Sequence, residues 1–326
     1  MNAGKHRRED RHAMTRYVMQ RILGMLAVMF TVVTIVFIIV RVAPGDPAAV
    51  MLGPDATAAD IAGLRSRLGL DQSLPTQYVL FLGQLLRGDL GQSIFLNMPV
   101  LSALAERAEP TFFLTLFSIL IASAIALPVG ILSAYKRGSL FDQLATTFAM
   151  FAASIPSFWL GLILIQVFAV RYGWMPASGY GGPDASFLER LRHLVLPALA
   201  LGIVSSALIT RFTRASMLDV LNDDYVRTAR SKGMGEWGVV MKHALKNALI
   251  PVLTVIGLTA ALLISGAVVT ETVFSLPGIG NLVVSAVLRR DYPVIQGALL
   301  VIAALYVLIN FLIDMLYLAI DPRVRY

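Results

Sequence analysis

Cysteine is absent from the 326-residue chain. The protein therefore has no disulfide framework, no thiolate metal site and no cysteine nucleophile. Charge is also scarce, because 14% of the residues are charged where soluble domains have about a quarter. Hydrophobic residues make up 57% of the chain. A soluble core does not enclose long uncharged runs whose side chains point in every direction, so the composition predicts a protein embedded in lipid.

The signatures of common catalytic sites are missing as well. No G-x-x-x-x-G-K-[ST] phosphate loop occurs, and the one Gly-Lys pair, Gly4-Lys5, lies in a basic N-terminal segment. The four histidines show no metal-ligand spacing, and no serine lies in a G-x-S-x-G turn. We therefore predict a protein that is not an enzyme and that has no cofactor and no metal site.

The net charge of +7 and the pI of 9.8 leave two interpretations. A basic protein can bind nucleic acid, but basic residues also collect in the cytoplasmic loops of membrane proteins. Because the chain is so apolar, we favour the second interpretation and expect no nucleic-acid partner.

Six apolar segments have about the 20 residues that a helix needs to cross the hydrocarbon core. We predict an all-α polytopic membrane protein with six transmembrane helices, in which Pro128 and Pro156 kink two of them. The predicted helices cover residues 22–42, 111–134, 144–170, 194–210, 248–270 and 297–318.

The distribution of lysine and arginine predicts that both termini are cytoplasmic. This orientation makes 1–21 a cytoplasmic basic tail, 43–109 a periplasmic loop region, 211–247 a cytoplasmic loop and 321–326 a cytoplasmic tail. In the periplasmic region, Thr57 is expected to cap a short helix that ends at Arg67, and a second helix is expected at 77–86. Asp314, near the inner end of the last helix, is the main ionisable residue in the spans. It is either a functional group or, as we favour, a residue at the membrane interface.

The loop between the fourth and fifth helices has the pattern of two short helices joined by a tight corner. Asn222 or Asp223 is expected to accept hydrogen bonds from the first turn, and Asp224 suits the positive end of that helix. Gly233 is placed where a helix ends through a left-handed residue, and Glu236 is expected to begin the second helix.

Ala229 and Gly233 are both small and lie four positions apart, so a helix would place them on one face. Such a face allows close approach by another surface. From spacing alone, the segment fits either the groove of a partner protein or the membrane surface, where its arginines would contact phospholipid headgroups.

The loop sequence resembles the E-A-A-x3-G loop of ABC-importer permeases. Arg227, Thr228 and Ala229 stand at the E-A-A positions, Gly233 at the glycine, and Ile250-Pro251 near the end of the motif. The replacement of Glu-Ala by Arg227-Thr228 is typical of the dipeptide/oligopeptide/nickel subfamily. Its other motifs occur in order in 88–93, 155–159, 196–199, 271–280 and 321–323. The single helix before a long outer loop is similar to the first permease of such systems.

This resemblance implies a type I ABC-importer permease fold for 110–320, with both termini inside. It also implies several partners: a second homologous permease, two cytoplasmic ATP-binding subunits, an external solute-binding protein and the lipid bilayer. The residues implied in coupling to the ATPase are Asp224, Tyr225, Arg227, Thr228, Ala229 and Gly233, with Ile250 and Pro251 fixing the turn into the fifth span. If Arg227 forms an ion pair with the ATPase, its partner there should be acidic.

The resemblance implies import of dipeptides or oligopeptides, with nickel chelates, glutathione, opines and oligosaccharides as alternatives. An ion-coupled secondary transporter is an alternative from another class, but it would carry ionisable groups near the membrane midplane, which these spans lack. A membrane-embedded enzyme and a structural scaffold are less favoured. In the outer segment at 271–280, Gly278 and Gly280 are expected to allow a tight turn.

Overall fold

The computed structural model describes residues 3–42, 46–67, 69–182 and 184–320. The predicted C-terminal tail, with Asp321-Pro322-Arg323, lies outside the described residues. The described chain is helical, and the one β-bridge found in it joins Gln92 to Pro99. Its elements in chain order are α1 (Ala3–Val42), α2 (Pro47–Leu52), α3 (Ala58–Arg67), α4 (Leu74–Leu86), α5 (Val100–Tyr135), α6 (Leu140–Ser154), α7 (Ser157–Leu164), the π-helical η1 (Ile165–Arg171), α8 (Phe187–Leu221), α9 (Asp224–Ser231), α10 (Glu236–Gly238), the π-helical η2 (Val239–Ala244), α11 (Leu245–Val273), α12 (Ile279–Arg289) and α13 (Tyr292–Ile320).

Five helical runs are long and apolar enough to cross a membrane, and a bent pair of helices supplies a sixth. The five are Val18–Val42, Val100–Tyr135, Phe187–Leu221, Glu236–Val273 and Tyr292–Met315. The prediction of an all-α polytopic membrane protein is confirmed.

The predicted continuous helix over 144–170 is wrong. The structure breaks it into Leu140–Ser154 and Ser157–Arg171, which meet at 96°. Ile155 is extended (φ −87°, ψ 126°), because the ring of Pro156 disfavours helical geometry in the preceding residue. Pro156 therefore turns the chain through about a right angle instead of kinking it.

Other helices extend past their predicted ends. α1 runs back through most of the predicted basic tail, and α5 includes 100–109 from the predicted outer loop. α8 continues through 211–221, so the loop between the fourth and fifth spans begins at Asn222 and is shorter than predicted. A helix continues into water where the sequence offers good helix formers such as Ala, Leu and Arg, so the apolar limit of a span does not mark the end of its helix.

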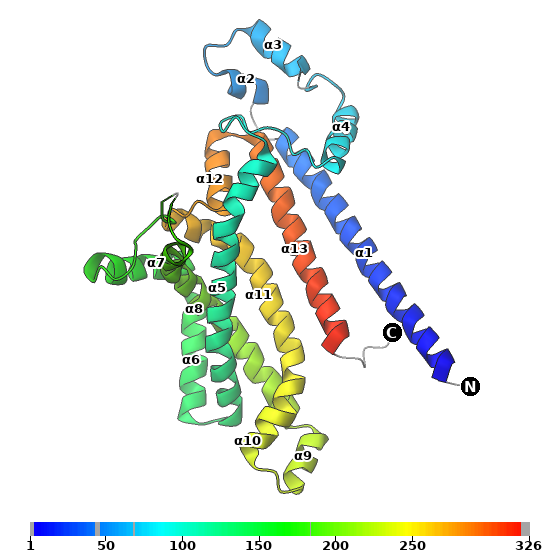
Figure 1. The fold of residues 1–326 in the computed structure, drawn as a ribbon, viewed down its shortest axis with the longest axis vertical. Helices are drawn as coiled ribbons and strands as arrows, with labels where there is room; N and C mark the ends of the chain where they lie inside the picture. The colour runs from blue at the N-terminus through cyan, green and yellow to red at the C-terminus, as the bar shows by residue number, and fades with distance from the viewer. Residues whose placement is uncertain (1–2, 43–45, 68, 183, 321–326) are drawn as a thin grey trace.

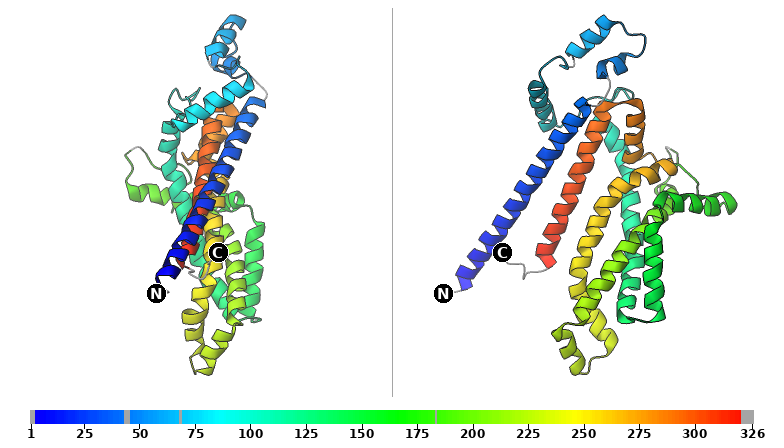
Figure 2. Two further views of the ribbon diagram at one scale, coloured as in Figure 1. Left: turned by 90° about the vertical axis from the view of Figure 1, so that its right-hand side faces the viewer. Right: turned by 180° about the vertical axis from the view of Figure 1, so that it is seen from behind.

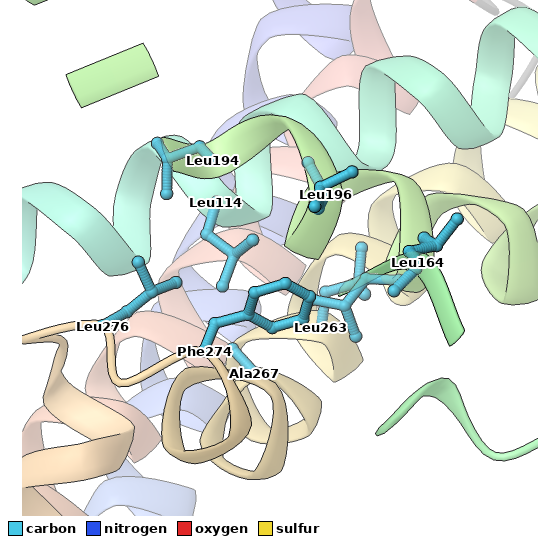
Figure 3. Close-up of a cluster of buried hydrophobic side chains, with 11 residues drawn as sticks. Leu114, Leu164, Leu194, Leu196, Leu263, Ala267, Phe274 and Leu276 are labelled. Atoms are coloured by element: carbon cyan, nitrogen blue, oxygen red, sulfur yellow. The ribbon is translucent and has the colours of Figure 1, made fainter. Parts of the chain in front are cut away.

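The helices pack most extensively where α5 meets α8. A Cβ on Gly202 would lie 2.8 Å from the Ile121 side chain and 3.0 Å from the Ser118 carbonyl oxygen. Small residues of this kind let the backbones of membrane helices approach closely. At one end of this contact, the buried Phe274 fills a space among leucines from α5, α7, α8 and α11 (Figure 3).

The ends of the bundle differ. The N-terminal end of α1, the C-terminal end of α13 and the α9–α10 segment lie toward one end, whereas α2, α3 and α4 lie at the other (Figures 1 and 2). This arrangement agrees with the predicted orientation, in which both termini share a side with the 211–247 loop.

The two helices predicted in the outer segment are present. α3 ends at Arg67, and the Thr57 hydroxyl accepts a hydrogen bond from the Asp60 amide at 3.2 Å. The Thr57 hydroxyl and amide both donate to the Asp60 carboxylate, which holds the pKa of Asp60 below its ordinary value. The second helix begins three residues earlier than predicted, at Leu74.

Candidate functional site

The segment that joins α8 to α11 is a folded unit at the end of the bundle (Figure 1). α9 begins after Asp223, whose backbone is extended but whose side chain makes no capping hydrogen bond. The Asn222 side chain donates to the Leu218 carbonyl at 2.9 Å, so it closes the end of α8. The prediction that one of these side chains caps the next helix is therefore wrong, because Asn222 is used by the helix before it.

The corner after α9 has the predicted geometry. Gly233 has φ +80°, the left-handed conformation that glycine adopts without strain, and Glu236 begins α10. Arg230 donates to the Glu236 carboxylate through two nitrogens at 3.0 and 3.3 Å. This ion pair closes the corner, although its partial exposure keeps its contribution small.

One face of α9 is packed against the protein. Val226 and Ala229 are buried against Val239 of η2. The predicted common face of Ala229 and Gly233 is not present, because Gly233 lies beyond the end of the helix and Ala229 points inward. The small size of Ala229 serves the close approach of α9 to its own chain.

The other face of α9, with the corner that follows it, is exposed and forms what we call the loop surface. Its exposed residues are Asp224, Tyr225, Arg227, Thr228, Ser231, Lys232, Gly233 and Met234. Arg227 pairs with Asp224 at 3.1 Å, with side chains 72% and 93% exposed. Such a pair contributes little in water, so both side chains remain free to exchange partners.

Tyr225 fixes α9 to the start of the fifth span. Asn247 of α11 donates its side-chain amide to the Tyr225 hydroxyl oxygen at 2.7 Å. The Tyr225 hydroxyl in turn donates to the His243 carbonyl at 3.4 Å. The loop surface is thus tied to the helix that would carry its movement into the membrane.

Tyr225→Phe should loosen α9 without unfolding the protein. The variant loses hydrogen bonds at a partly exposed site, at a cost of about 0.5–1.5 kcal/mol. We expect amide hydrogen exchange to accelerate across Asp224–Ser231 and to stay unchanged in α5. Equal exchange in the variant and the parent protein would contradict the anchoring role of the hydroxyl.

Ile250 and Pro251 do not form a turn into the fifth span. Both lie inside the continuous helical run Glu236–Val273, and Pro251 is accommodated in α11 without a break. The irregularity lies earlier, in the π-helical η2. The predicted turn is wrong because the helix already begins at Glu236.

Sequence reasoning missed three buried carboxylates, those of Asp142, Glu271 and Asp291. Asp142, at the start of α6, accepts from Arg214 of α8 at 2.6 and 2.8 Å, from the Gly138 amide at 2.9 Å and from Ser133. Arg214 lies seven residues before the end of α8, so this cluster holds the α5–α6 hairpin against the helix that leads to the loop surface. An aspartate in the first turn of an otherwise apolar helix was the signal available in the sequence.

Glu271, at the end of α11, is the second missed carboxylate. It accepts from Thr111 of α5 at 2.6 Å and from the Asn281 amide at 3.0 Å. Thr111 also accepts from the Ile279 amide at 2.9 Å. Together the two side chains accept hydrogen bonds from backbone amides in the first turn of α12. Glu271 therefore caps α12 from a different helix, and its role is structural.

Asp314 is not isolated in the last span. It pairs with Arg21 of α1 at 3.1 Å, and both side chains are partly exposed. The ion pair supports the interpretation of Asp314 as an interface residue.

The fold defines a class, that of multi-pass helical membrane proteins with a folded segment between two of their spans. The chain belongs to the family described as binding-protein-dependent transport system inner membrane components, which matches residues 126–326. A companion N-terminal family matches residues 14–115. The protein is thus a multi-pass inner-membrane permease of a binding-protein-dependent importer.

Several curated proteins are similar over nearly their whole length. A probable peptide ABC transporter permease of Sinorhizobium fredii is 44% identical over 95% of this chain and 99% of its own. A dipeptide transport system permease of Alkalihalophilus pseudofirmus is 42% identical, over 96% of this chain and 100% of its own. A glutathione transport system permease of Escherichia coli K12 is 43% identical over the same shares.

Solved structures show the same fold at lower identity. An inward-facing form of the MetNI methionine ABC transporter contains a chain that superposes with a TM-score of 0.57 at 19% identity. The match covers 67% of this chain and 96% of the other. At this identity the likeness establishes the fold of the bundle.

Proposed function

We propose that the loop surface docks a separate ATP-binding subunit and transmits its movement to the membrane helices. The observation that carries this proposal is that α9 has one buried face and one exposed face. Its apolar side chains Val226 and Ala229 are buried against η2, whereas its polar side chains are exposed. α9 therefore has no free apolar stripe with which to lie on lipid, which favours a protein partner over the membrane surface.

The chain connections supply the route of transmission. α9 follows α8 after two residues, and α10 continues through η2 into α11. Two membrane spans therefore emerge from one small unit that Tyr225 and Arg230 hold together. A partner that grips the loop surface would move both spans as one body, which is the requirement for switching between inward-facing and outward-facing states.

The complete importer we propose contains a second homologous permease, two ATP-binding subunits and an external solute-binding protein. The transported solute we propose is a dipeptide or oligopeptide, since curated relatives at 42–44% identity are named for peptides, dipeptides or glutathione. We propose that ATP hydrolysis on the partner subunits drives import and that Arg227 faces an acidic residue of the ATPase.

Gly233 offers a matched test of docking. A Cβ at Gly233 meets no atom within 4 Å, and its φ of +80° strains alanine and tryptophan alike. The difference in activity between Gly233→Trp and Gly233→Ala therefore measures only the effect of side-chain size at the docking face. We expect Gly233→Trp to lower peptide uptake and solute-stimulated ATP hydrolysis by more than about tenfold, which corresponds to a loss of ~1.4 kcal/mol in docking.

Gly233→Ala should retain most of the activity, and both variants should reach the membrane in normal amounts. Equal uptake by the two variants would show that nothing docks closely at Gly233. Co-purification of the ATP-binding subunit with each variant gives a readout that is independent of the transported solute.

A further inference from the structure

The loop 92–99, which precedes α5 at the end of the bundle opposite the loop surface, is fixed by a carboxylate from another part of the chain (Figure 1). Asp291 lies between α12 and α13 and is 2% exposed. One of its oxygens accepts from the Ser93 hydroxyl at 2.6 Å and from the Phe95 amide at 3.3 Å. The other accepts from the Val294 amide at 3.4 Å. Because a buried carboxylate is costly without such partners, Asp291 holds the loop on the first turn of α13.

The loop is also closed by its own hydrogen bonds. The Ser93 amide donates to the Met98 carbonyl at 3.0 Å. The Leu96 amide donates to the Ser93 hydroxyl oxygen at 2.9 Å. A loop that is ordered in this way loses little conformational entropy when another molecule binds it, so it is preorganised for binding.

The side chains that this loop presents are apolar and exposed. Phe95 is 43% exposed and Leu96 is 40% exposed. The guanidinium of Arg289 lies over the Phe95 ring, 5.8 Å from its centroid. Beside the ring, a cleft of about 140 Å³ is lined by Arg289 of α12 and Arg107 of α5. We call Phe95, Leu96, Arg107 and Arg289 the outer tip.

The outer tip has a surplus of positive charge. Within the described residues, the side chains of Arg107 and Arg289 form no ion pair and donate no hydrogen bond. Asp291 lines the same cleft, so two arginines face one carboxylate, whose oxygens are already used by the loop and by α13. The cleft can therefore accept a further carboxylate, which arginine binds through two parallel hydrogen bonds.

A protein suits this surface better than lipid does. Aromatic and arginine side chains are the residues enriched at the centres of protein interfaces. Three charged residues, Glu106, Arg107 and Glu109, stand on α5 between the loop and the uncharged part of the helix that begins at Pro110. Ten residues of helix, roughly 15 Å, therefore separate the loop from that uncharged part. The outer tip thus lies on the water side of these charges.

We propose that the outer tip docks the external solute-binding protein. Phe95 and Leu96 enter an apolar pocket of that protein, and one of its acidic side chains enters the cleft between Arg107 and Arg289. The family is binding-protein-dependent, and the proposal rests on the importer assembly proposed above for the identity of this partner. It does not require that the loop surface docks an ATPase.

The test measures binding to the full-length importer in nanodiscs, without ATP. The probe is the purified solute-binding protein that restores peptide uptake by the same nanodisc-reconstituted subunits in liposomes. Arg107→Glu combined with Arg289→Glu should weaken the Kd at least about tenfold, and Phe95→Ala should do the same. The effect of the double variant should shrink as salt is added, because charges in an open cleft are screened. Arg87→Glu is the matched control, since Arg87 is exposed at this end but does not line the cleft, and its Kd should stay within about twofold of the parent value.

Ser93→Ala tests the preorganisation of the loop while leaving the outer tip unchanged. It removes the hydrogen bonds of the hydroxyl to Asp291 and to the Leu96 amide. Amide hydrogen exchange should accelerate across 93–98, and the Kd should weaken by about threefold.

A photo-crosslinker identifies what touches the outer tip. The chain has no cysteine, so Leu96→Cys supplies a unique thiol for a benzophenone maleimide. Cross-linking to the solute-binding protein that is lost when Arg107→Glu and Arg289→Glu are added supports the proposal. Cross-linking to lipid alone or to a second permease alone overturns it, and so does a Kd that is equal in the parent protein, Phe95→Ala and the double variant. Because no ATP is used, failure of the Gly233 test leaves this result intact.

Discussion

Asp142→Asn is expected to destabilise the protein strongly and to reduce the amount that reaches the membrane. The Asp142 carboxylate is 4% exposed and accepts four hydrogen bonds, two of them from Arg214. Asparagine has the same shape, but it replaces one acceptor by an NH₂ group that faces other donors. Arg214 is left without its counter-charge at the junction of α5, α6 and α8.

Removing one partner of a fully buried ion pair costs about 3–5 kcal/mol. The Arg214 side chain is 28% exposed, so water partly compensates it and we expect a loss of about 2–3 kcal/mol. Thermal melting of the detergent-solubilised protein, followed by fluorescence-detected size exclusion, measures this loss. Arg214→Lys keeps the charge but not the two-nitrogen geometry, so it should melt between the parent and Asp142→Asn.

Asp224→Asn is the matched control, because Asp224 pairs with Arg227 on the exposed loop surface. Its melting temperature should equal that of the parent protein. If Asp142→Asn also melts like the parent, the cluster does not hold the α5–α6 hairpin against α8.

Gly278→Ala is expected to have the second large effect on stability. Gly278 bends the chain before α12 with φ −95°, an ordinary conformation, so the turn there does not depend on the conformational freedom of glycine. Its role is space, because a Cβ at Gly278 would overlap the Glu271 carboxylate. Gly280 is similar, since its Cβ would lie 2.6 Å from the Val268 Cα. In the Gly278→Ala variant, the added methyl group would push Glu271 away from Thr111 and Asn281.

Overpacking at such a site costs about 1–3 kcal/mol, and the displaced cap adds to it. Gly235→Ala is the matched control, because Gly235 precedes α10 with the same extended backbone and has no atom within 4 Å of its Cβ. We expect the melting temperature to fall for Gly278→Ala only. Equal melting temperatures of the two variants would show that α12 moves aside without loss of stability.

The sequence by itself determined the class of protein and most of its helices. A run of about 20 apolar residues is a local property, and so is the glycine that ends α9. Five of the membrane spans, the helix before Arg67, the left-handed Gly233 and the start of α10 at Glu236 were therefore predictable. The family motifs were also local, since each is a short stretch of sequence and they follow one another in the order typical of the family.

The tertiary structure alone decided which side chains face each other. Asp142 meets Arg214 across 72 positions, and Thr111 meets Glu271 across 160. No periodicity along the chain encodes such pairs, because they depend on how separate helices pack. The same reason explains why Ala229 faces inward. Spacing fixes the face of a helix on which a residue lies, but only packing decides what covers that face.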